Sequence, residues 1–362
     1  MSIKEIAKRA NTSISTVSRV LNDPNYHCNK KGLSEQIWAI AKELDYLPNT
    51  AAQNLRKGIR KELHNPFTID VFLTRFRSLE QDTFFKELYQ ILKEELLIQG
   101  CYLGEILTSL DVTELTYTSN TTAKTRTVPY RPKSAQPQNP DTLAYITQKK
   151  NTGLLLFGKC PEELFPILKK RYAYIVGIDR NPTDYLYDEV ICNGSTAAEK
   201  AMDYLISLGH RSIAYIGDCT YESRYIGYYQ ALLNHKIPLR HENIHPTSQT
   251  EKEGLETMLS ILEKPERPSA FFCANDVTAI GVVKALQKKK KKGYVPSVIS
   301  IDDIQEAEFT TPPLTTISIP KHEMVHLAVA LMLDRRSGRH KETVRLEMPC
   351  KLIVRESCTY FI

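Results

Sequence analysis

The sequence predicts a small all-α helix-turn-helix unit at the N-terminus, followed by a larger α/β body built of two lobes. Three observations lead to this expectation. Short amphipathic helices, with a tight turn between the first two, fill the first sixty residues. From about residue 67, strand-like apolar runs alternate with amphipathic helices, a pattern typical of parallel sheets covered by helices. The chain of 362 residues is also long enough for more than one domain.

The N-terminal unit begins with a helix expected over residues 3–10, whose apolar residues recur along one face. A tight turn follows, in which Asn11 is expected to adopt a positive φ, because asparagine tolerates the left-handed region. Ser13 is expected to cap a second helix, predicted from about Ile14 to Leu21. The run Asn-Asp-Pro-Asn at 22–25 ends that helix.

A third helix is predicted after Ser34, which is expected to cap it, and a fourth short segment over residues 50–57 ends at Gly58. Three short helices with a tight turn between the first two follow the helix-turn-helix plan. Because helix-turn-helix spacing is loose, an ordinary helical hairpin with a polar outer face remains the alternative on pattern alone.

The body contains more residues than one sheet accommodates, so two α/β lobes are expected. Residues 111–141 interrupt the alternation, being rich in Thr, Ser, Asn, Pro and Gln, and are expected to form a long mobile loop. The expected strands are 67–73, 102–107, 153–157, 174–178, 213–216, 270–273 and 298–301. The expected helices are 84–99, 195–208, 224–235, 276–288 and 320–333.

Composition and charge exclude several classes of protein. With 42% hydrophobic and 25% charged residues the chain is neither disordered nor fibrous. Of its net charge of +6, the first sixty residues carry +5, which fits a basic nucleic-acid-binding module attached to a near-neutral body. No apolar run approaches the roughly 18 residues of a membrane span. The eight cysteines form no CxxC pair, so free thiols in a reducing cytoplasm are expected.

The second helix has the chemistry of a major-groove reader. Ile14 offers an apolar contact, Ser15 and Thr16 offer hydroxyls, and Arg19 lies one turn on, where it can reach a guanine edge. The hydroxyls of this helix can equally bind phosphate oxygens, which sets the register on the duplex without reading its sequence.

Several segments resemble one family. IKEIAKRA at 3–10 and SISTVSRVLN at 13–22 match its N-terminal signature, and YLPNTAAQNL at 46–55 matches its hinge. Blocks of the body follow in order: LGHRSIAYIG at 208–217, SR and GY at 223–228, AND at 274–276, VISIDD at 298–303 and PLTTI at 313–317. On these segments the chain resembles the lactose/galactose repressor (LacI/GalR) family of bacterial transcriptional regulators.

The resemblance implies a DNA-binding domain with a hinge over residues 1–58. It implies an effector-binding and dimerisation domain over residues 59–362, with the two-lobed α/β fold of type I periplasmic binding proteins. The hinge would become helical only on DNA and insert Leu55 into the minor groove; a plain linker is the alternative. Ile14 and Ser15 would set specificity, and Arg19 would contact a base. The candidate DNA-binding residues are Ser13, Ile14, Ser15, Thr16, Ser18, Arg19, Asn22, Asn49, Ala52 and Leu55.

The sequence departs from the family at two places. Asn11-Thr12 replaces the usual Gly-Val of the first turn, so the turn depends on a positive φ at Asn11. Residues 23–32, which include two adjacent lysines, differ from the commonest pattern and could add phosphate contacts. The base preference of the family therefore does not transfer to this chain.

Polar side chains follow the expected strands of the body, where ligands of two-lobed α/β proteins bind. Carboxylates, an amide and a guanidinium converging on one cleft suit the vicinal hydroxyls of a sugar. The resemblance supports Arg224, Asn275 and Asp302, while the other candidates rest on placement and could equally be a surface ion pair, a core aromatic or a helix cap. The candidate effector-binding residues are Arg75, Phe84, Asp179, Arg224, Asn275 and Asp302.

The expected function is a sequence-specific transcriptional regulator that represses carbohydrate-utilisation genes, needs no cofactor or metal, and is not an enzyme. It would bind a pseudo-palindromic double-stranded operator as a homodimer and would be switched by a small sugar, with no membrane partner. Whether the sugar releases or strengthens DNA binding does not follow from the sequence. A regulator governed by a protein partner instead of a free sugar is the alternative.

Three motif matches point to other chemistry and carry little weight. His322, Glu323 and His326 form HExxH, typical of zinc hydrolases, but the third ligand at metzincin spacing is absent. The segment 153–160 nearly matches a phosphate-binding loop, yet Cys160 replaces the hydroxyl that holds magnesium. The lysine run 288–292 ends a helix, where cations complement the dipole.

Overall fold

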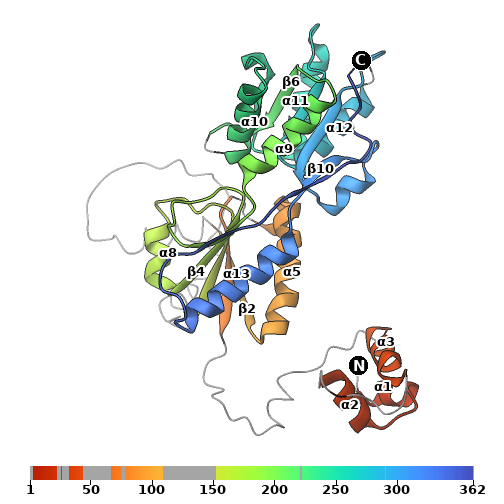
Figure 1. Cartoon of the computed structure of the whole chain (residues 1–362), viewed down its shortest axis with the longest axis vertical. Coiled ribbons are helices and arrows are strands. Elements are labelled where there is room, and N and C mark those ends of the chain that lie inside the picture. The colour runs from red at the N-terminus through yellow and green to blue at the C-terminus, as the bar shows by residue number, and fades with distance from the viewer. Residues whose placement is uncertain are drawn as a thin grey trace, which may run out of the picture. The chain divides into compact units, whose positions relative to one another are not determined.

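The computed structural model describes residues 3–22, 26, 32–43, 67–75, 78–108, 152–220, 222–289 and 291–361. The chain divides into two units, Met1–Asn65 and Pro66–Ile362 (Figure 1). The expected hinge segment 50–57, the 58/59 boundary and the loop 111–141 lie outside the described residues, so these expectations stay untested.

The described residues of the first unit form three helices, α1 (Ile3–Arg9), α2 (Ile14–Asn22) and α3 (Leu33–Glu43). Their apolar faces meet in one core, in which Ile6, Val17 and Ile37 are fully buried. The predicted helix-turn-helix arrangement is therefore present.

The turn between α1 and α2 has the predicted geometry. Asn11 has a φ of 46°, and the Thr12 amide donates to the Ala7 carbonyl at 3.0 Å. Ser13 caps α2, because its Oγ accepts a hydrogen bond from the Thr16 amide at 3.1 Å. The N-terminus of α3 differs from the expectation that Ser34 caps it.

Helix α3 begins at Leu33, one residue before Ser34 and two residues before the start that a Ser34 cap would give. The carbonyl of Gly32, whose φ is 81°, accepts from the Gln36 amide at 3.1 Å, so Ser34 lies inside the first turn. A glycine reaches this positive φ at little cost, which allows the chain to enter the helix before the serine.

The first lobe of the second unit is built on a fully parallel sheet in the order β11-β5-β4-β3-β1-β2. Its central strands are buried on both faces: Leu155 and Phe157 of β3 face the main core, while Leu154 and Leu156 face a second apolar cluster. The strands are β1 (Thr68–Leu73), β2 (Tyr102–Thr108), β3 (Thr152–Phe157), β4 (Tyr174–Asp179), β5 (Asp188–Ile191) and β11 (Arg345–Glu347).

Helices cover both faces of this sheet. Helix α5 (Thr83–Gln99) and helix α13 (Lys321–Arg336) contribute Leu88 and Val325, among others, to the main core, and they lie beside each other in Figure 1. Helix α8 (Phe165–Arg171) packs Phe165 and Leu168 into the second cluster. Asp82 caps α5 by accepting from the Phe85 amide at 3.1 Å.

The second lobe has a sheet in the order β12-β10-β9-β8-β6-β7, parallel except for the antiparallel edge strand β12. Its strands are β6 (Ile213–Gly217), β7 (Ile244–Pro246), β8 (Ala270–Cys273), β9 (Ser297–Asp302), β10 (Thr315–Ser318) and β12 (Lys351–Ile353). Its helices are α9 (Gly194–Ser207), α10 (Ser223–Asn234), α11 (Glu251–Glu263) and α12 (Asp276–Lys288), with 3-10 turns at His241–Asn243 and Gln305–Phe309.

The described chain passes between the lobes three times (Figure 1). It leaves the first sheet between β5 and α9, returns between β10 and α13, and leaves again between β11 and β12. Each lobe is therefore assembled from separate stretches of sequence. Among the described residues, no helix is long and apolar enough to cross a membrane.

Candidate functional site

Helix α2 presents a polar face to solvent. Ile14 is 45% exposed, and Ser15 and Arg19 are also exposed, while Val17 and Val20 are buried against the other helices. Thr16 and Ser18 lie half-buried at the edge of this face. The amphipathic pattern thus separates the candidate DNA contacts from the core of the unit.

Hydrogen bonds organise the start of this face. The Ser13 hydroxyl lies 2.8 Å from both the Ser15 Oγ and the Thr16 Oγ1. No acidic residue occupies the first turn of α2, so no carboxylate within that turn offsets the partial positive charge at the N-terminus of the helix. At the other end, the Arg19 guanidinium lies 5.8 Å from the centroid of the Tyr26 ring, a contact that the sequence analysis missed.

The predicted DNA-binding roles remain predictions. Asn22 is the last residue of α2, and Asn49, Ala52 and Leu55 lie outside the described residues.

In the body, Arg224 is fully buried in the first turn of α10. Its Nε and Nη2 donate to the two carboxylate oxygens of Glu222 at 2.9 and 2.7 Å. Its Nη1 donates to the Ala274 carbonyl at 2.6 Å. Sequence reasoning found Arg224 but missed Glu222, which also caps α10 by accepting from the Arg224 amide at 3.4 Å.

Gln249 joins Arg224 to the first lobe. Its Oε1 accepts from Arg224 Nη2 and from Arg75 Nη1, both at 2.9 Å. Arg75 follows β1 of the first sheet, whereas Gln249 follows β7 of the second. The Nε2 of Gln249 is buried and has no hydrogen-bond partner.

A second connection between the lobes is the ion pair of Arg180 and Asp302. Arg180 follows β4 and Asp302 ends β9, so each lies at the carboxyl end of a parallel strand. The Arg180 guanidinium lies 4.3 Å from the centroid of the Phe84 ring. Phe84 is therefore a buried core aromatic, and the Arg180 guanidinium covers a face of its ring.

Asn275 serves as the N-cap of α12, since its Oδ1 accepts from the Thr278 amide at 3.0 Å. Its Nδ2 donates to the Gln249 carbonyl at 3.2 Å, which ties the cap to the same network. Asp179 ends β4 beside Arg180, and its Oδ2 is buried without a partner.

The structure thus brings all six predicted effector residues to one junction between the lobes. It adds Glu222, Gln249 and Arg180, which the sequence analysis did not select. Glu222 had a local indication, because it directly precedes a helix. Gln249 had none, because its partners Arg75 and Arg224 are distant in sequence.

The charges of this junction shift one another's titration. Burial alone would raise the pKa of Glu222, but Arg224, with help from Arg180 and Arg75, lowers it to about 2. Burial raises the pKa of Asp179 and Asp302 despite the nearby Arg180. We call this set of side chains, Arg75, Asp179, Arg180, Glu222, Arg224, Gln249 and Asp302, the junction network.

Asp276, fully buried at the start of α12, borders the junction network. It accepts hydrogen bonds from Ser300 Oγ at 2.5 Å and from Thr316 Oγ1 at 2.6 Å. Burial, together with the like charge of Asp302, raises the pKa of Asp276 to about 7.

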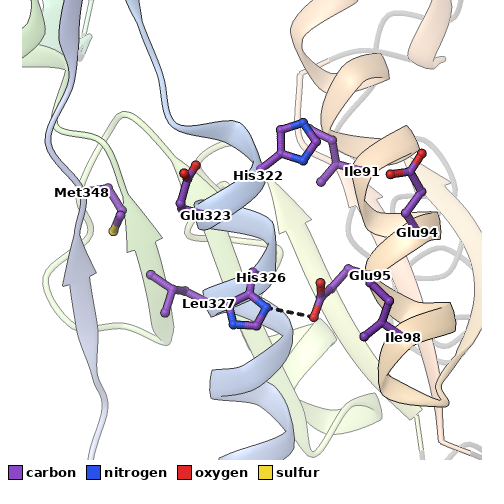
Figure 2. A pocket seen from close by; sticks show the side chains of 9 residues that line it. All are labelled: Ile91, Glu94, Glu95, Ile98, His322, Glu323, His326, Leu327 and Met348. Carbon is purple, nitrogen blue, oxygen red and sulfur yellow. Dashed lines mark hydrogen bonds and ion pairs between the residues drawn. The ribbon is translucent and has the colours of Figure 1, made fainter. Parts of the chain in front are cut away.

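The HExxH residues line a different cavity, of about 440 Å³, between α5 and α13 (Figure 2). His326 Nδ1 lies 3.0 Å from Glu95 Oε1, whereas the Glu323 side chain points away from that pair, on the side of α13 nearer Met348 (Figure 2). Among the described residues, no group of three or more His, Cys, Asp or Glu is arranged to hold a metal ion.

Comparisons with known proteins match both units. The model of the lacI family of bacterial regulatory proteins covers residues 2–49, and that of the periplasmic binding protein-like domain covers residues 202–358. The chain is 26% identical over 368 residues to the probable HTH-type transcriptional repressor ExuR of Bacillus subtilis, an alignment that spans 99% of this chain and 98% of the relative.

Solved structures share the whole architecture. The transcriptional regulator CelR, in complex with cellobiose, aligns with a TM-score of 0.66 at 21% identity, over 99% of this chain and 100% of that one. The lac repressor dimer, bound to operator and the anti-inducer ONPF, aligns with a TM-score of 0.64 at 19% identity, over 99% of both chains. These likenesses confirm the predicted fold: a helix-turn-helix unit and a two-lobed α/β body of the periplasmic-binding-protein type. The chain therefore combines the DNA-binding domain of the lacI family of bacterial regulatory proteins with a periplasmic binding protein-like domain, and the relatives that it matches over nearly its whole length are named transcriptional repressors.

Proposed function

We propose that this protein represses transcription as a homodimer that binds a pseudo-palindromic operator through α2, and that a small sugar bound at the junction network changes its affinity for DNA. The observation that carries the first part is the exposed face of α2, on which Ile14, Ser15 and Arg19 project from a separately cored unit. The proposed target genes serve carbohydrate utilisation.

Three buried polar atoms at the junction support a small polar ligand. Gln249 Nε2 and Arg180 Nε are donors without acceptors, and Asp179 Oδ2 is an acceptor without a donor. Leaving a buried polar group unsatisfied costs about 1–3 kcal/mol each, so a molecule that supplies both donors and acceptors gains from meeting them. Vicinal hydroxyl groups have this dual character, and the complex of CelR is with cellobiose, a sugar.

The same residues suggest how binding would reach the DNA. Arg180–Asp302 and Arg75–Gln249 each join one lobe to the other, so a ligand that replaces these partners changes the relation between the lobes. A ligand with different affinities for two arrangements of the lobes shifts their populations, and hence the placing of two α2 helices on an operator.

The first experiment identifies the DNA. The full-length protein selects binding sites from a random duplex pool, and fluorescence anisotropy then measures affinity for the recovered sequence at several salt concentrations. We expect a pseudo-palindromic site with salt-dependent affinity. Tight binding by a chain that lacks residues 1–58 would overturn the assignment.

The second experiment identifies the effector. A thermal-shift panel of neutral sugars and sugar acids should reveal at least one compound that raises the melting temperature, because a ligand of the folded state stabilises it. The same compound should change operator affinity in the anisotropy assay. The variant to compare with wild type in both assays is the double substitution Glu222→Gln/Arg224→Met. It removes both charges of the buried Glu222–Arg224 ion pair, so that neither charge is left buried alone.

A regulator controlled by a protein partner is the second candidate, favoured by one observation. The Arg224 guanidinium donates to Glu222, Ala274 and Gln249, so groups of the protein itself already engage this side chain. Operator binding with no response to any sugar of the panel would favour that candidate over the sugar model.

A further inference from the structure

Two cysteines lie in the segments that connect the lobes. Cys192 follows β5 of the first sheet and precedes α9 of the second lobe. Cys350 lies between β11 of the first sheet and β12 of the second. Each therefore lies in a segment where the chain passes from one lobe to the other.

The two segments run side by side. Strands β5 and β11 are parallel neighbours in which Glu347 pairs with Ile191, and the Met348 amide donates to the Ile191 carbonyl at 2.8 Å. Just beyond this last ladder contact, the side chains of Cys192 and Cys350 lie close enough together for each thiol to shift the pKa of the other. Both are free cysteines, and both are buried.

The pKa of Cys350 shifts in the opposite direction from those of the other described cysteines. The neighbouring Cys192 thiol and, to a lesser degree, the charge of Lys200 lower the pKa of Cys350, while the Cys350 thiol raises the pKa of Cys192. Lys200 is exposed and its Nζ donates to the Cys350 carbonyl at 2.9 Å, so this cysteine lies just beneath the surface. In contrast, burial raises the pKa of Cys101, Cys160, Cys219, Cys273 and Cys358.

We propose that Cys192 and Cys350 form a redox site, in which a small hydroperoxide such as hydrogen peroxide converts the neighbouring thiols into a disulfide that joins two of the segments connecting the lobes. The oxidant must be small to reach the sulfur atoms, because Cys192 is fully buried and Cys350 is only 5% exposed.

The reaction balances in two steps. The Cys350 thiolate attacks one peroxide oxygen, the O–O bond breaks, and the sulfur becomes a sulfenic acid as hydroxide leaves and is protonated to water. The Cys192 sulfur, losing its proton, then attacks the sulfenic sulfur, and the S–O bond breaks with release of a second water. Two thiols and one peroxide give one disulfide and two waters.

Joining these segments restrains the movement of one lobe relative to the other. This consequence rests on the proposed function, because it matters only if a shift between the lobes transmits an effector signal. Under that function, the oxidised protein responds less to its effector than the reduced protein does.

Peptide mapping of the full-length protein tests the site itself. The reduced protein is treated with submillimolar hydrogen peroxide, alkylated, and digested with trypsin without reduction. Cleavage after Arg180, Lys200, Arg345 and Lys351 places the two cysteines alone in peptides 181–200 and 346–351. We expect these peptides to appear as one cross-linked species, the thiol count in denaturant to fall from eight to six, and dithiothreitol to reverse both changes.

Variants identify the pair. Cys192→Ser and Cys350→Ser should each abolish the cross-linked species, whereas Cys101→Ser should retain it. Cys101 is the matched control, a buried free cysteine beside β2 at the opposite edge of the same sheet. Oxidation of Cys350 alone to sulfinic acid, or cross-links that connect other cysteines, would overturn the proposal. The wild-type mapping decides the matter even if a variant fails to fold.

Anisotropy on selected DNA tests the consequence separately. If the cross-link forms and the effector response is unchanged, the link to signalling is wrong although the redox site exists. If the protein selects no DNA, the proposed function fails, while the peptide map still decides the redox site.

Discussion

Arg180 and Asp302 form a buried ion pair that joins the two lobes, and the face of Phe84 lies against the same guanidinium at 4.3 Å. Asp302→Ala leaves Arg180 buried without this partner. Breaking a buried pair costs about 3–5 kcal/mol, and we expect about 3 kcal/mol because Asp179 still lies beside the arginine. Urea unfolding measures the loss. The double variant Arg180→Met/Asp302→Leu should be the more stable of the two, and an equal or larger loss in the double variant would contradict this interpretation.

Glu222 should make stability depend on pH in acid. Its pKa is about 2 in the folded protein and 4.5 in the unfolded chain, so folding favours its charged form. The stabilisation is present above pH 4.5 and disappears as the pH falls toward 2. Urea unfolding across this range should therefore give a shallower pH dependence for Glu222→Gln than for wild type. Glu80→Gln, a surface carboxylate paired with Lys86, is the control and should keep the wild-type slope.

Arg19 should contribute strongly to affinity for the selected operator. Removing a guanidinium that contacts a base in two places costs about 1–3 kcal/mol, so we expect Arg19→Ala to weaken binding by about 5- to 150-fold in anisotropy. Gln36→Ala on α3, also an exposed helical position, is the control and should bind as wild type. An unchanged affinity for Arg19→Ala would remove this residue from the interface.

The positive φ of Asn11 makes the first turn sensitive to substitution. Asn11→Val places a β-branched side chain in the left-handed region and should destabilise the N-terminal unit by about 1–2 kcal/mol. Asn11→Gly should be tolerated, because glycine adopts this conformation freely. The single tryptophan, Trp38, lies in α3, so its fluorescence during urea unfolding reports on this unit. Equal stability of the two variants would show that the turn does not depend on this conformation.

The HExxH match should not correspond to a zinc site. We expect elemental analysis to find substoichiometric zinc in the purified protein. His326→Ala should change the free energy of unfolding by less than about 1 kcal/mol, because His326 is exposed and loses only a surface ion pair with Glu95. One bound zinc per chain that is lost in His322→Ala would revive the hydrolase alternative.

The strong periodic patterns of the sequence predicted most of the fold. Helices α5 and α12 and strands β1, β6 and β8 lie within a residue or two of the expected bounds, because their apolar residues alone define them. The short strand β5 was missed, since it begins with Asp188 and Glu189, which look like loop residues. They are buried because Arg335 and Arg345, far along the chain, pair with them.

The candidate site divides in the same way. Arg224, Asn275 and Asp302 lie beside matched family segments and at strand ends, so both motif and placement indicated them. Gln249 follows a three-residue strand, and its contacts with Arg75 and Arg224 arise only when the two lobes meet. A contact between residues that belong to different lobes leaves no periodic trace in the sequence around either one.

The three passages of the chain between the lobes have a consequence for biosynthesis. The sheet of the first lobe lacks its edge strand β11, and the helix α13 that covers it, until the ribosome has translated residues 321–347. The residues of α1, α2 and α3 emerge first and supply most of a core that is separate from that of the body. A transcript cut short within the body would therefore release a polypeptide with a finished helix-turn-helix unit and an unfinished sensor.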